Sequence, residues 1–133
     1  MLINELFSEA EGFCPFYISD QWQVSQLNYC REQDVESICD LEVHADTDEI
    51  FILIRGRALI LACSDSKETD MQYLKPDIGR VYVVPQNVYH NIAMEQGTEV
   101  IIIEKPNTHK NVRNAVTINN QHIRELRTKW RLV

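Results

Sequence analysis

Short apolar segments separated by polar turns follow one another along most of the chain. Residues 50–54 are apolar at every position, which predicts a strand buried on both faces. Many short strands with turn signals between them and little helix are typical of a β-sandwich or barrel. We therefore predict strands at residues 21–29, 37–44, 50–54, 58–63, 71–74, 81–84, 88–93 and 98–104.

Helical periodicity is confined to the two ends. Residues 2–10 place their apolar side chains on one side of a helix. Residues 119–130 begin with an asparagine, which can cap a helix, and carry Ile123, Leu126 and Trp130 on one stripe. We therefore predict a single domain over residues 1–133, with a barrel core at about residues 20–105, a short amino-terminal helix and a carboxy-terminal helix at about residues 119–130.

The predicted strand at residues 37–44 carries polar groups on one face and apolar groups on the other. Asp40, Glu42 and His44 alternate with three smaller or apolar residues, Cys39, Leu41 and Val43, and alternate side chains leave opposite faces of a strand. The apolar face must be covered by a second sheet, by the amino-terminal segment or by a partner subunit. From this face we predict a homodimer.

The composition of the chain is typical of a soluble domain and argues against a protein that binds nucleic acid or spans a membrane. The chain has 133 residues, 44% of them hydrophobic and 25% charged, with a net charge of −7; these values are typical of a soluble domain that can bury a core. A nucleic-acid-binding face would need clustered basic residues, so nucleic acid is not an expected partner. No apolar run approaches the ~20 residues of a membrane helix. The absence of a secretory signal and of closely paired cysteines predicts a cytoplasmic protein with free thiols.

Candidate metal ligands gather in one stretch. Glu42, His44 and Glu49 fall within eight residues beside a strongly apolar segment, and His90 follows at a later turn. Two imidazoles and a carboxylate from His44, Glu49 and His90 suit iron, manganese, zinc, nickel or cobalt. Glu42 has two possible roles: a fourth ligand that makes the site more anionic, or a carboxylate placed over the metal as a general base.

Two spacings in the chain resemble the motifs of the cupin superfamily. The first cupin motif has two histidines two apart, then four residues, a glutamate, six residues and a glycine; here Glu42 stands at the first histidine position, followed by His44, Glu49 and Gly56. The second motif has a glycine, five residues, a proline and a histidine five positions later, which Gly79, Pro85 and His90 match.

This resemblance implies an all-β double-stranded β-helix, a jelly-roll barrel, in which Glu42, His44, Glu49 and His90 converge on a divalent metal. Glu42 departs from the pattern by replacing a histidine, but it keeps a residue type that can bind metal. Asn87 replaces a glycine that the motif commonly has in the turn, and asparagine tolerates the positive φ that such a turn needs. Without a cation, two buried carboxylates at Glu42 and Glu49 would repel each other.

The expected function is that of a metal-dependent enzyme acting on a small polar metabolite inside the barrel, with dioxygenase, isomerase or lyase chemistry. The alternative is a non-catalytic barrel that senses a small ligand, with or without metal, and a third reading is a scaffold without a ligand. Asn28, Phe51 and Tyr82 are candidates to line the pocket. His109 and His122 lie outside the motifs and are expected on the surface.

Overall fold

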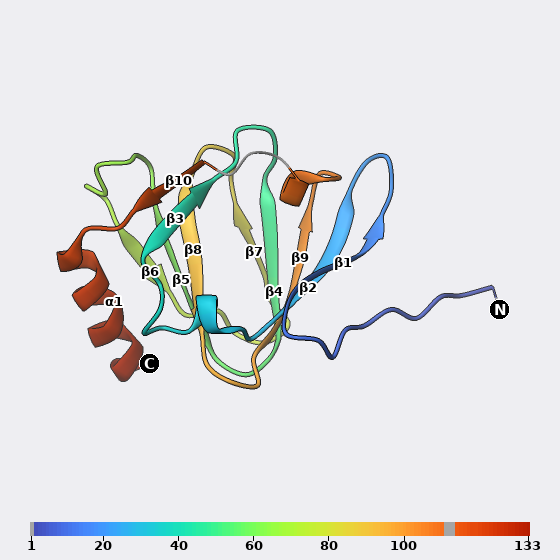
Figure 1. Cartoon of the computed structure of the whole chain (residues 1–133), viewed down its shortest axis with the longest axis horizontal. Coiled ribbons are helices and arrows are strands. Elements are labelled where there is room, and N and C mark those ends of the chain that lie inside the picture. Colours follow the sequence, from blue (N-terminus) through green and yellow to red (C-terminus); the bar gives the residue numbers. More distant parts are fainter. Residues whose placement is uncertain (1, 111–113) are drawn as a thin grey trace.

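The computed structural model describes residues 2–110 and 114–133, which form two antiparallel five-stranded sheets (Figure 1). The two sheets confirm the predicted all-β jelly-roll. In order across the first sheet lie β1 (Gly12–Ile18), β2 (Gln23–Asn28), β9 (Glu99–Glu104), β4 (Glu49–Arg55) and β7 (Val81–Val84). In order across the second lie β10 (Asn114–Thr117), β3 (Asp40–Val43), β8 (Tyr89–Met94), β5 (Ala58–Cys63) and β6 (Gln72–Leu74). The helical elements of the described residues are two single turns, η1 (Arg31–Gln33) and η2 (Thr108–Lys110), and the helix α1 (Asn120–Leu132).

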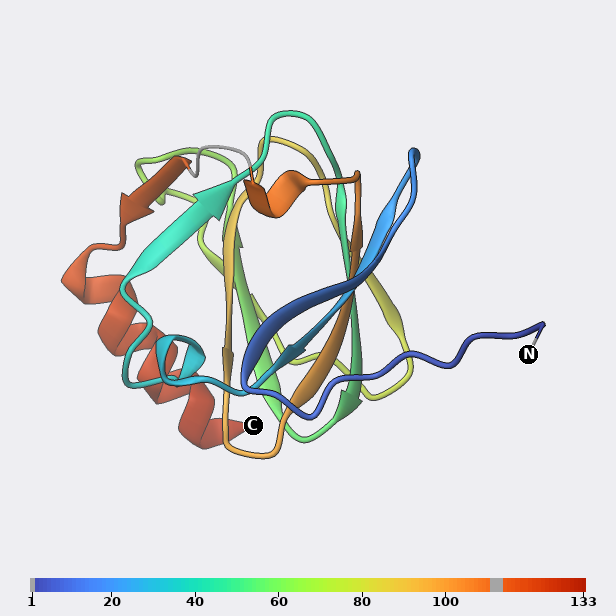
Figure 2. The same cartoon turned by 45° about the vertical axis from the view of Figure 1, so that its right-hand side comes forward.

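The two sheets face each other across the main hydrophobic core. This core combines apolar side chains of the first sheet, such as Phe51 and Ile102, with side chains of the second, such as Ile60, Ile92 and Met94. Figure 2 shows the two layers from the side, joined by the loops at either end. The site described below lies in the space between these layers.

A second hydrophobic cluster covers the outer face of the second sheet. Leu41 of β3 and Leu61 of β5 are fully buried there against Leu126 and Trp130 of α1. The guanidinium of Arg57 lies 3.8 Å from the centre of the Trp130 ring and donates to the Trp130 carbonyl oxygen at 2.8 Å. The apolar face of β3 is thus covered by the chain's own carboxy-terminal helix. Leu41 therefore gives no argument for a dimer, and the homodimer stays a prediction.

Strand β4 is buried on its inner face only. Glu49, Phe51 and Leu53 point inward and are buried, whereas Ile52 is half-buried and Ile54 is 43% exposed. The prediction of burial on both faces was wrong, because none of the helices in the described residues covers the outer surface of the first sheet (Figure 1). Strand propensity favours β-branched residues, so the apolar outer residues of β4 alone do not indicate a second buried layer.

The amino-terminal helix predicted for residues 2–10 was also wrong. These residues form no helix. Residues 2–7 extend away from the barrel, with Phe7 66% exposed (Figure 1), whereas the main chain of Ser8 is bonded to Gln26 and Asn28 of β2. Ile3, Leu6 and Phe7, which would form the apolar side of such a helix, are all exposed, and an isolated helix this short is unstable in water. The following apolar stretch forms β1, which pairs antiparallel with β2.

Two residues with positive φ, Asn87 and Gly56, form turns next to strands that carry the site. Asn87 adopts a φ of 67°, as expected of an asparagine in place of a motif glycine. Gly56 ends β4 with a φ of 87°, and a Cβ atom there would collide with the backbone of Thr98. Both residues set turns that lead into or out of strands bearing the site.

Two further observations on the described residues are the state of the cysteines and the length of the helices. Cys14, Cys30, Cys39 and Cys63 are all free. None of the helices in the described part of the chain has the length and apolarity needed to cross a bilayer.

The packing of α1 gives a first prediction. Leu126→Ala should lower the free energy of unfolding by about 2–5 kcal/mol, because it empties a fully buried site between the helix and the sheet. Leu132→Ala is the matched control, since Leu132 lies on the same helix and is 80% exposed. Chemical denaturation of both variants measures the difference. A loss below about 1 kcal/mol for Leu126→Ala would contradict the assignment of α1 as the cover of this sheet.

Candidate metal centre

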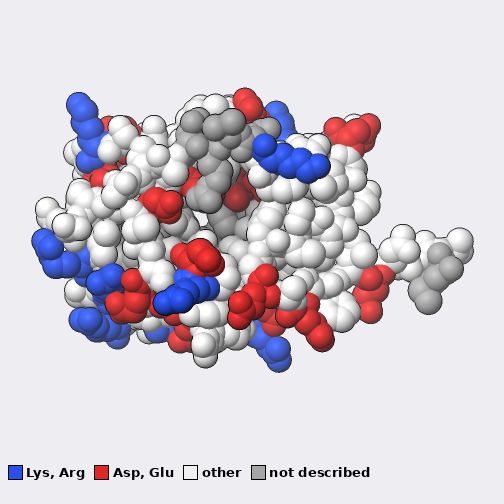
Figure 3. Space-filling model, in the orientation of Figure 1, with Lys and Arg blue, Asp and Glu red and all other residues white. Residues whose placement is uncertain are grey.

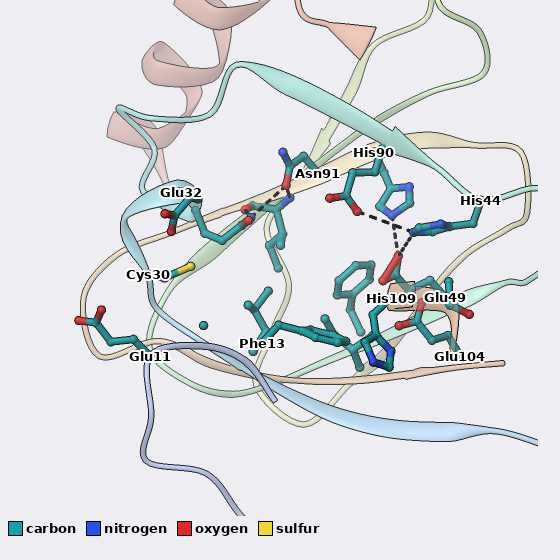
Figure 4. A pocket seen from close by; sticks show the side chains of 18 residues that line it. Glu11, Phe13, Cys30, Glu32, His44, Glu49, His90, Asn91, Glu104 and His109 are labelled. Carbon is teal, nitrogen blue, oxygen red and sulfur yellow. Dashed lines mark hydrogen bonds and ion pairs between the residues drawn. The ribbon is translucent and has the colours of Figure 1, made fainter. Parts of the chain in front are cut away.

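A cavity of about 530 Å³ opens between the two sheets. Figure 3 shows a hollow on this side of the molecule, with acidic side chains around it. Its apolar walls come from both sheets and include Leu27, Phe51, Ile92 and Ile102. Three of the predicted metal ligands, His44, Glu49 and His90, lie at one end of this cavity (Figure 4), and the fourth, Glu42, also lines it.

Three of the predicted ligands come together from the two facing sheets, one from β4 of the first sheet and two from β3 and β8 of the second. Glu49 opens β4, His90 is the second residue of β8, and His44 directly follows β3. One donor atom from each side chain lies within 4.8 Å of the other two, a spacing that allows all three to bind one metal ion. His90 Nε2 is 2.6 Å from Glu49 Oε1, and His44 Nε2 is 3.7 Å from the same oxygen. Residues from two separate sequence motifs are thus brought together as one group of potential metal ligands.

The three side chains are sheltered from water. Glu49 and His90 are buried, with 6% and 4% of their surface exposed, and His44 is half-buried. The Phe51 and His90 rings pack edge to face, with 6.0 Å between ring centres. Charge in this setting is costly unless it is balanced by an opposite charge.

Hydrogen bonding fixes how the His90 ring can be protonated. Its Nδ1 lies 2.9 Å from the Val88 carbonyl oxygen, which can only accept, so Nδ1 carries a hydrogen. In a neutral ring Nε2 then presents a lone pair, directed at Glu49 Oε1 at 2.6 Å. Two acceptors at that distance require a proton or a metal ion between them.

The shift in the pKa of His90 also indicates that the contact between His90 and Glu49 needs a proton or a metal ion. Burial lowers the pKa of this imidazole, but the hydrogen bond and charge of Glu49 raise it more, so that the net shift is upward from 6.5. In the metal-free protein a proton therefore balances the buried Glu49 carboxylate. A divalent metal bound to Nε2 and to Glu49 would take the place of this proton.

Glu42 lies beside the triad. Its Oε2 is 3.7 Å from His44 Nε2, and its backbone pairs with that of His90 across β3 and β8. With 31% of its side chain exposed, Glu42 lines the cavity next to His44. This position is open to both roles considered for it, a fourth ligand or a base next to the metal.

The structure adds a carboxyl group that the motifs did not identify. Glu104 is buried at the end of β9, where Gln23 Nε2 donates to its Oε2 at 3.2 Å. Burial, and then the charge of Glu49, raise the pKa of Glu104 to about 8. The alternation of β9, in which Val100 and Ile102 point inward, was the signal that could have placed Glu104 inside the barrel.

The three residues predicted to line the pocket are dispersed. Phe51 lines the cavity. Asn28 donates to the carbonyl oxygens of Ser8 and Ala10, outside the barrel interior. Tyr82 packs against the main core and lines a separate groove next to β6.

The two remaining histidines also differ in position. His109 is exposed, yet it lines the mouth of the cavity, where its ring lies 5.6 Å from that of Phe13. His122 lies far along the chain in α1 and contacts Glu68, with 3.0 Å between Nδ1 and Oε1. His109 is therefore the histidine outside the motifs that belongs to the cavity.

The shifted pKa values predict how the metal-free protein responds to pH. Glu104 in the folded protein keeps its proton up to about pH 8, and His90 keeps its proton above pH 6.5, whereas the unfolded chain loses both protons earlier. The stability of the metal-free protein should therefore fall as pH rises: the contribution of Glu104 is lost from its ordinary pKa of 4.5 up to about pH 8, and that of His90 is lost above pH 6.5. Each unit of pKa difference corresponds to about 1.4 kcal/mol.

Glu104→Gln isolates one part of this effect. The variant keeps the shape of the side chain but cannot ionise, so its melting temperature should depend less on pH than that of the unchanged protein. Thermal denaturation in the presence of a chelator measures both. An unchanged slope would show that Glu104 does not remain protonated in the folded state.

Comparison with known proteins identifies the family and the fold. A family model described as Cupin matches residues 26–131. Among solved structures, a cupin-2 domain protein from Shewanella frigidimarina is 22% identical, with a TM-score of 0.52 and coverage of 75% of this chain and 84% of that one. An RmlC-like cupin from Methanocaldococcus jannaschii, with a double-stranded β-helix fold, is 16% identical, with a TM-score of 0.57 and coverage of 83% and 96%.

An enzyme is also among the similar structures. Oxalate decarboxylase is 16% identical, with a TM-score of 0.56, and the match covers 74% of this chain and 24% of that one. A comparison with curated proteins finds no match. The match to the family model over most of the chain, together with two facing sheets that surround the motif residues, shows that this chain belongs to the cupin family.

Proposed function

We propose that this cupin is a metal-dependent enzyme that acts on a small polar metabolite in the barrel cavity. The observation that carries the proposal is the buried contact of 2.6 Å between Glu49 Oε1 and His90 Nε2. Because Nδ1 of the same ring is bonded to a carbonyl oxygen, this contact needs a cation to balance it. His44 brings a third donor to the same point.

The donor set indicates which metals fit. Two imidazole nitrogens and a carboxylate suit iron, manganese, zinc or nickel better than magnesium or calcium, which prefer oxygen ligands. A bound ion of this kind would supply Lewis acidity or redox chemistry to a substrate in the cavity. With three protein ligands, coordination positions remain for the substrate or water.

The chain's own residues would orient and protonate the substrate. Glu42 lies beside His44 with part of its side chain exposed to the cavity, where it can move a proton if it is not a ligand. Phe51 and Ile102 exclude water from one side of the site. This arrangement supports dioxygenase, isomerase or lyase chemistry. The likeness to oxalate decarboxylase supports only the point that a barrel of this shape can serve an enzyme.

A metal-free binding barrel is the second candidate. It is favoured by the same contact, since a single proton on His90 also balances Glu49 and leaves the cavity intact. In that case the protein would bind a small ligand without turning it over. The homodimer and the cytoplasmic location remain predictions under either function.

Metal content separates the two candidates. Protein purified after growth in metal-replete medium should contain close to one equivalent of a transition metal by elemental analysis. His44→Ala and His90→Ala should each abolish tight binding, because each removes one of three ligands. His109→Ala is the control, since it removes a cavity histidine outside the triad and should retain the metal. Metal-free protein before any substitution would reject the enzyme and leave the binding barrel.

Glu42→Gln tests the role of Glu42 in the same assay. If Glu42 is a ligand, metal content should fall about as much as in the histidine variants. If it is a base, metal content should hold while turnover is lost.

The pH dependence of metal binding gives another prediction. The ligand histidines bind metal only when deprotonated, and their ordinary pKa is ~6.5. Because the pKa of His90 is raised, competition with protons should start above this value. Affinity should fall steadily as pH drops from about 7 to about 5. Titration against a chromophoric chelator at several pH values measures this, and an affinity independent of pH would exclude the histidines as ligands.

A further inference from the structure

The outer face of the first sheet carries two cross-strand rows of mostly aliphatic side chains. In order across β2, β9, β4 and β7, the first row consists of Val24, Ile103, Ile50 and Val83, and the second of Gln26, Ile101, Ile52 and Val81. Alternation along the strands turns these residues outward, because their neighbours Phe51 and Ile102 belong to the main core. The two rows form one continuous surface, which we call the aliphatic face.

Strand propensity alone does not explain the aliphatic face. Threonine also favours strands, yet none of these positions holds a threonine. An antiparallel sheet with one side in water normally alternates apolar and polar residues, whereas β4 is apolar on both sides from Ile50 to Ile54. At the edge of the face, Val81 and Val83 are exposed. A contiguous exposed apolar surface of this kind marks an interaction site.

The aliphatic face is also nearly free of charge. The charged residues on its four strands are Glu49 and Glu104, which are buried, and Arg55 and Glu99, which form an ion pair at 3.4 Å. The whole chain has a net charge of −7, so two copies repel each other over most of their surface. On this face two copies can meet without bringing like charges together. The face therefore suits a second copy better than a strongly charged partner.

The amino-terminal arm, residues 2–7, starts from the same face. Ser8 N donates to Gln26 Oε1 at 3.1 Å, and Gln26 Nε2 donates to the Ser8 carbonyl oxygen at 3.0 Å. Gln26 belongs to the second row, so the arm leaves the barrel beside the aliphatic side chains (Figures 1 and 2). The apolar residues of the arm are all exposed: Leu2, Ile3, Leu6 and Phe7. One chain thus presents two adjoining apolar surfaces that it does not cover itself.

Face and arm together match the area that a stable dimer needs. Strands lie about 4.8 Å apart and rise about 3.3 Å per residue, so four strands of about six residues present a face on the order of 400 Å². A stable interface buries about 800 Å² on each partner, and the face alone is too small. An extended arm of this length reaches about 20 Å. If two copies exchange arms, each buries its own arm and the surface beneath its partner's arm.

We propose that a second copy of this chain covers the aliphatic face, with the two faces packed together about a twofold axis and each amino-terminal arm laid over the partner. Such a pairing is isologous, so every contact occurs twice. The inference goes beyond the proposed function, because the cavity lies on the inner side of the same sheet and metal binding does not depend on the pairing.

The molar mass in solution tests this pairing. Sedimentation equilibrium of the full chain at micromolar concentration should give the mass of two chains. Ile52→Lys and Val81→Lys should each raise the dissociation constant by about a hundredfold or more, because each variant places two unpaired charges in an apolar interface. Leu132→Lys is the matched control, since it makes the same kind of change at an exposed residue of α1, which covers the other sheet. It should leave the dissociation constant unchanged.

Variants in the arm test the exchange. Leu6→Ser and Phe7→Ser should each weaken pairing by about tenfold, whereas Asn4→Ser, a polar change on the same arm, should not. Circular dichroism confirms that each variant is folded; Val81 and Phe7 are exposed in the single chain, so their substitution does not disturb its core.

The contradicting outcomes are specific. A single-chain mass at all concentrations up to about 100 μM would overturn the inference, since an interface of about 800 Å² per partner holds a dimer together below that concentration. A dimer that survives both lysine substitutions on the face, or that Leu132→Lys disrupts equally, would place the interface elsewhere and overturn it as well. Unchanged pairing in both serine variants of the apolar arm residues would overturn the exchange of arms.

Discussion

The buried contact between Glu49 and His90 is the constraint on which the site depends. A carboxylate and an imidazole at 2.6 Å, both almost fully buried, cannot remain as two unprotonated acceptors. The Val88 carbonyl oxygen holds the hydrogen of the ring on Nδ1, so whatever balances the pair must sit between Nε2 and the carboxylate. A proton does so in the metal-free protein, and a metal ion with His44 as a further ligand would replace it.

The fold keeps this pair in place by burying both faces of one sheet. The main core fills the space between the sheets, and α1 covers the outside of β3, β5 and β8. His90 and the backbone of Glu42 are therefore held on strands that are packed from both sides, while Glu49 comes from the facing sheet. The donors thus belong to rigid elements, as a preformed metal site requires.

The sequence predicted the fold through local signals and missed features that depend on distant contacts. Motif spacing and period-two alternation were enough for the sandwich and for the grouping of His44, Glu49 and His90. The amino-terminal helix was predicted wrongly, because periodicity cannot show whether a partner surface exists. Glu104 was overlooked because its importance comes from burial beside Glu49 on a strand far away in the chain, which no motif records.

Nitrogen-15 NMR of the His90 ring, with and without zinc, tests the central claim most directly. We predict that in metal-free protein at neutral pH both ring nitrogens carry hydrogen. On addition of zinc, Nε2 should lose its hydrogen and shift to the range of a metal-bound nitrogen while Nδ1 keeps its hydrogen bond to Val88. A ring whose Nε2 stays protonated in excess zinc would contradict the account of Glu49 and His90 as a cation site.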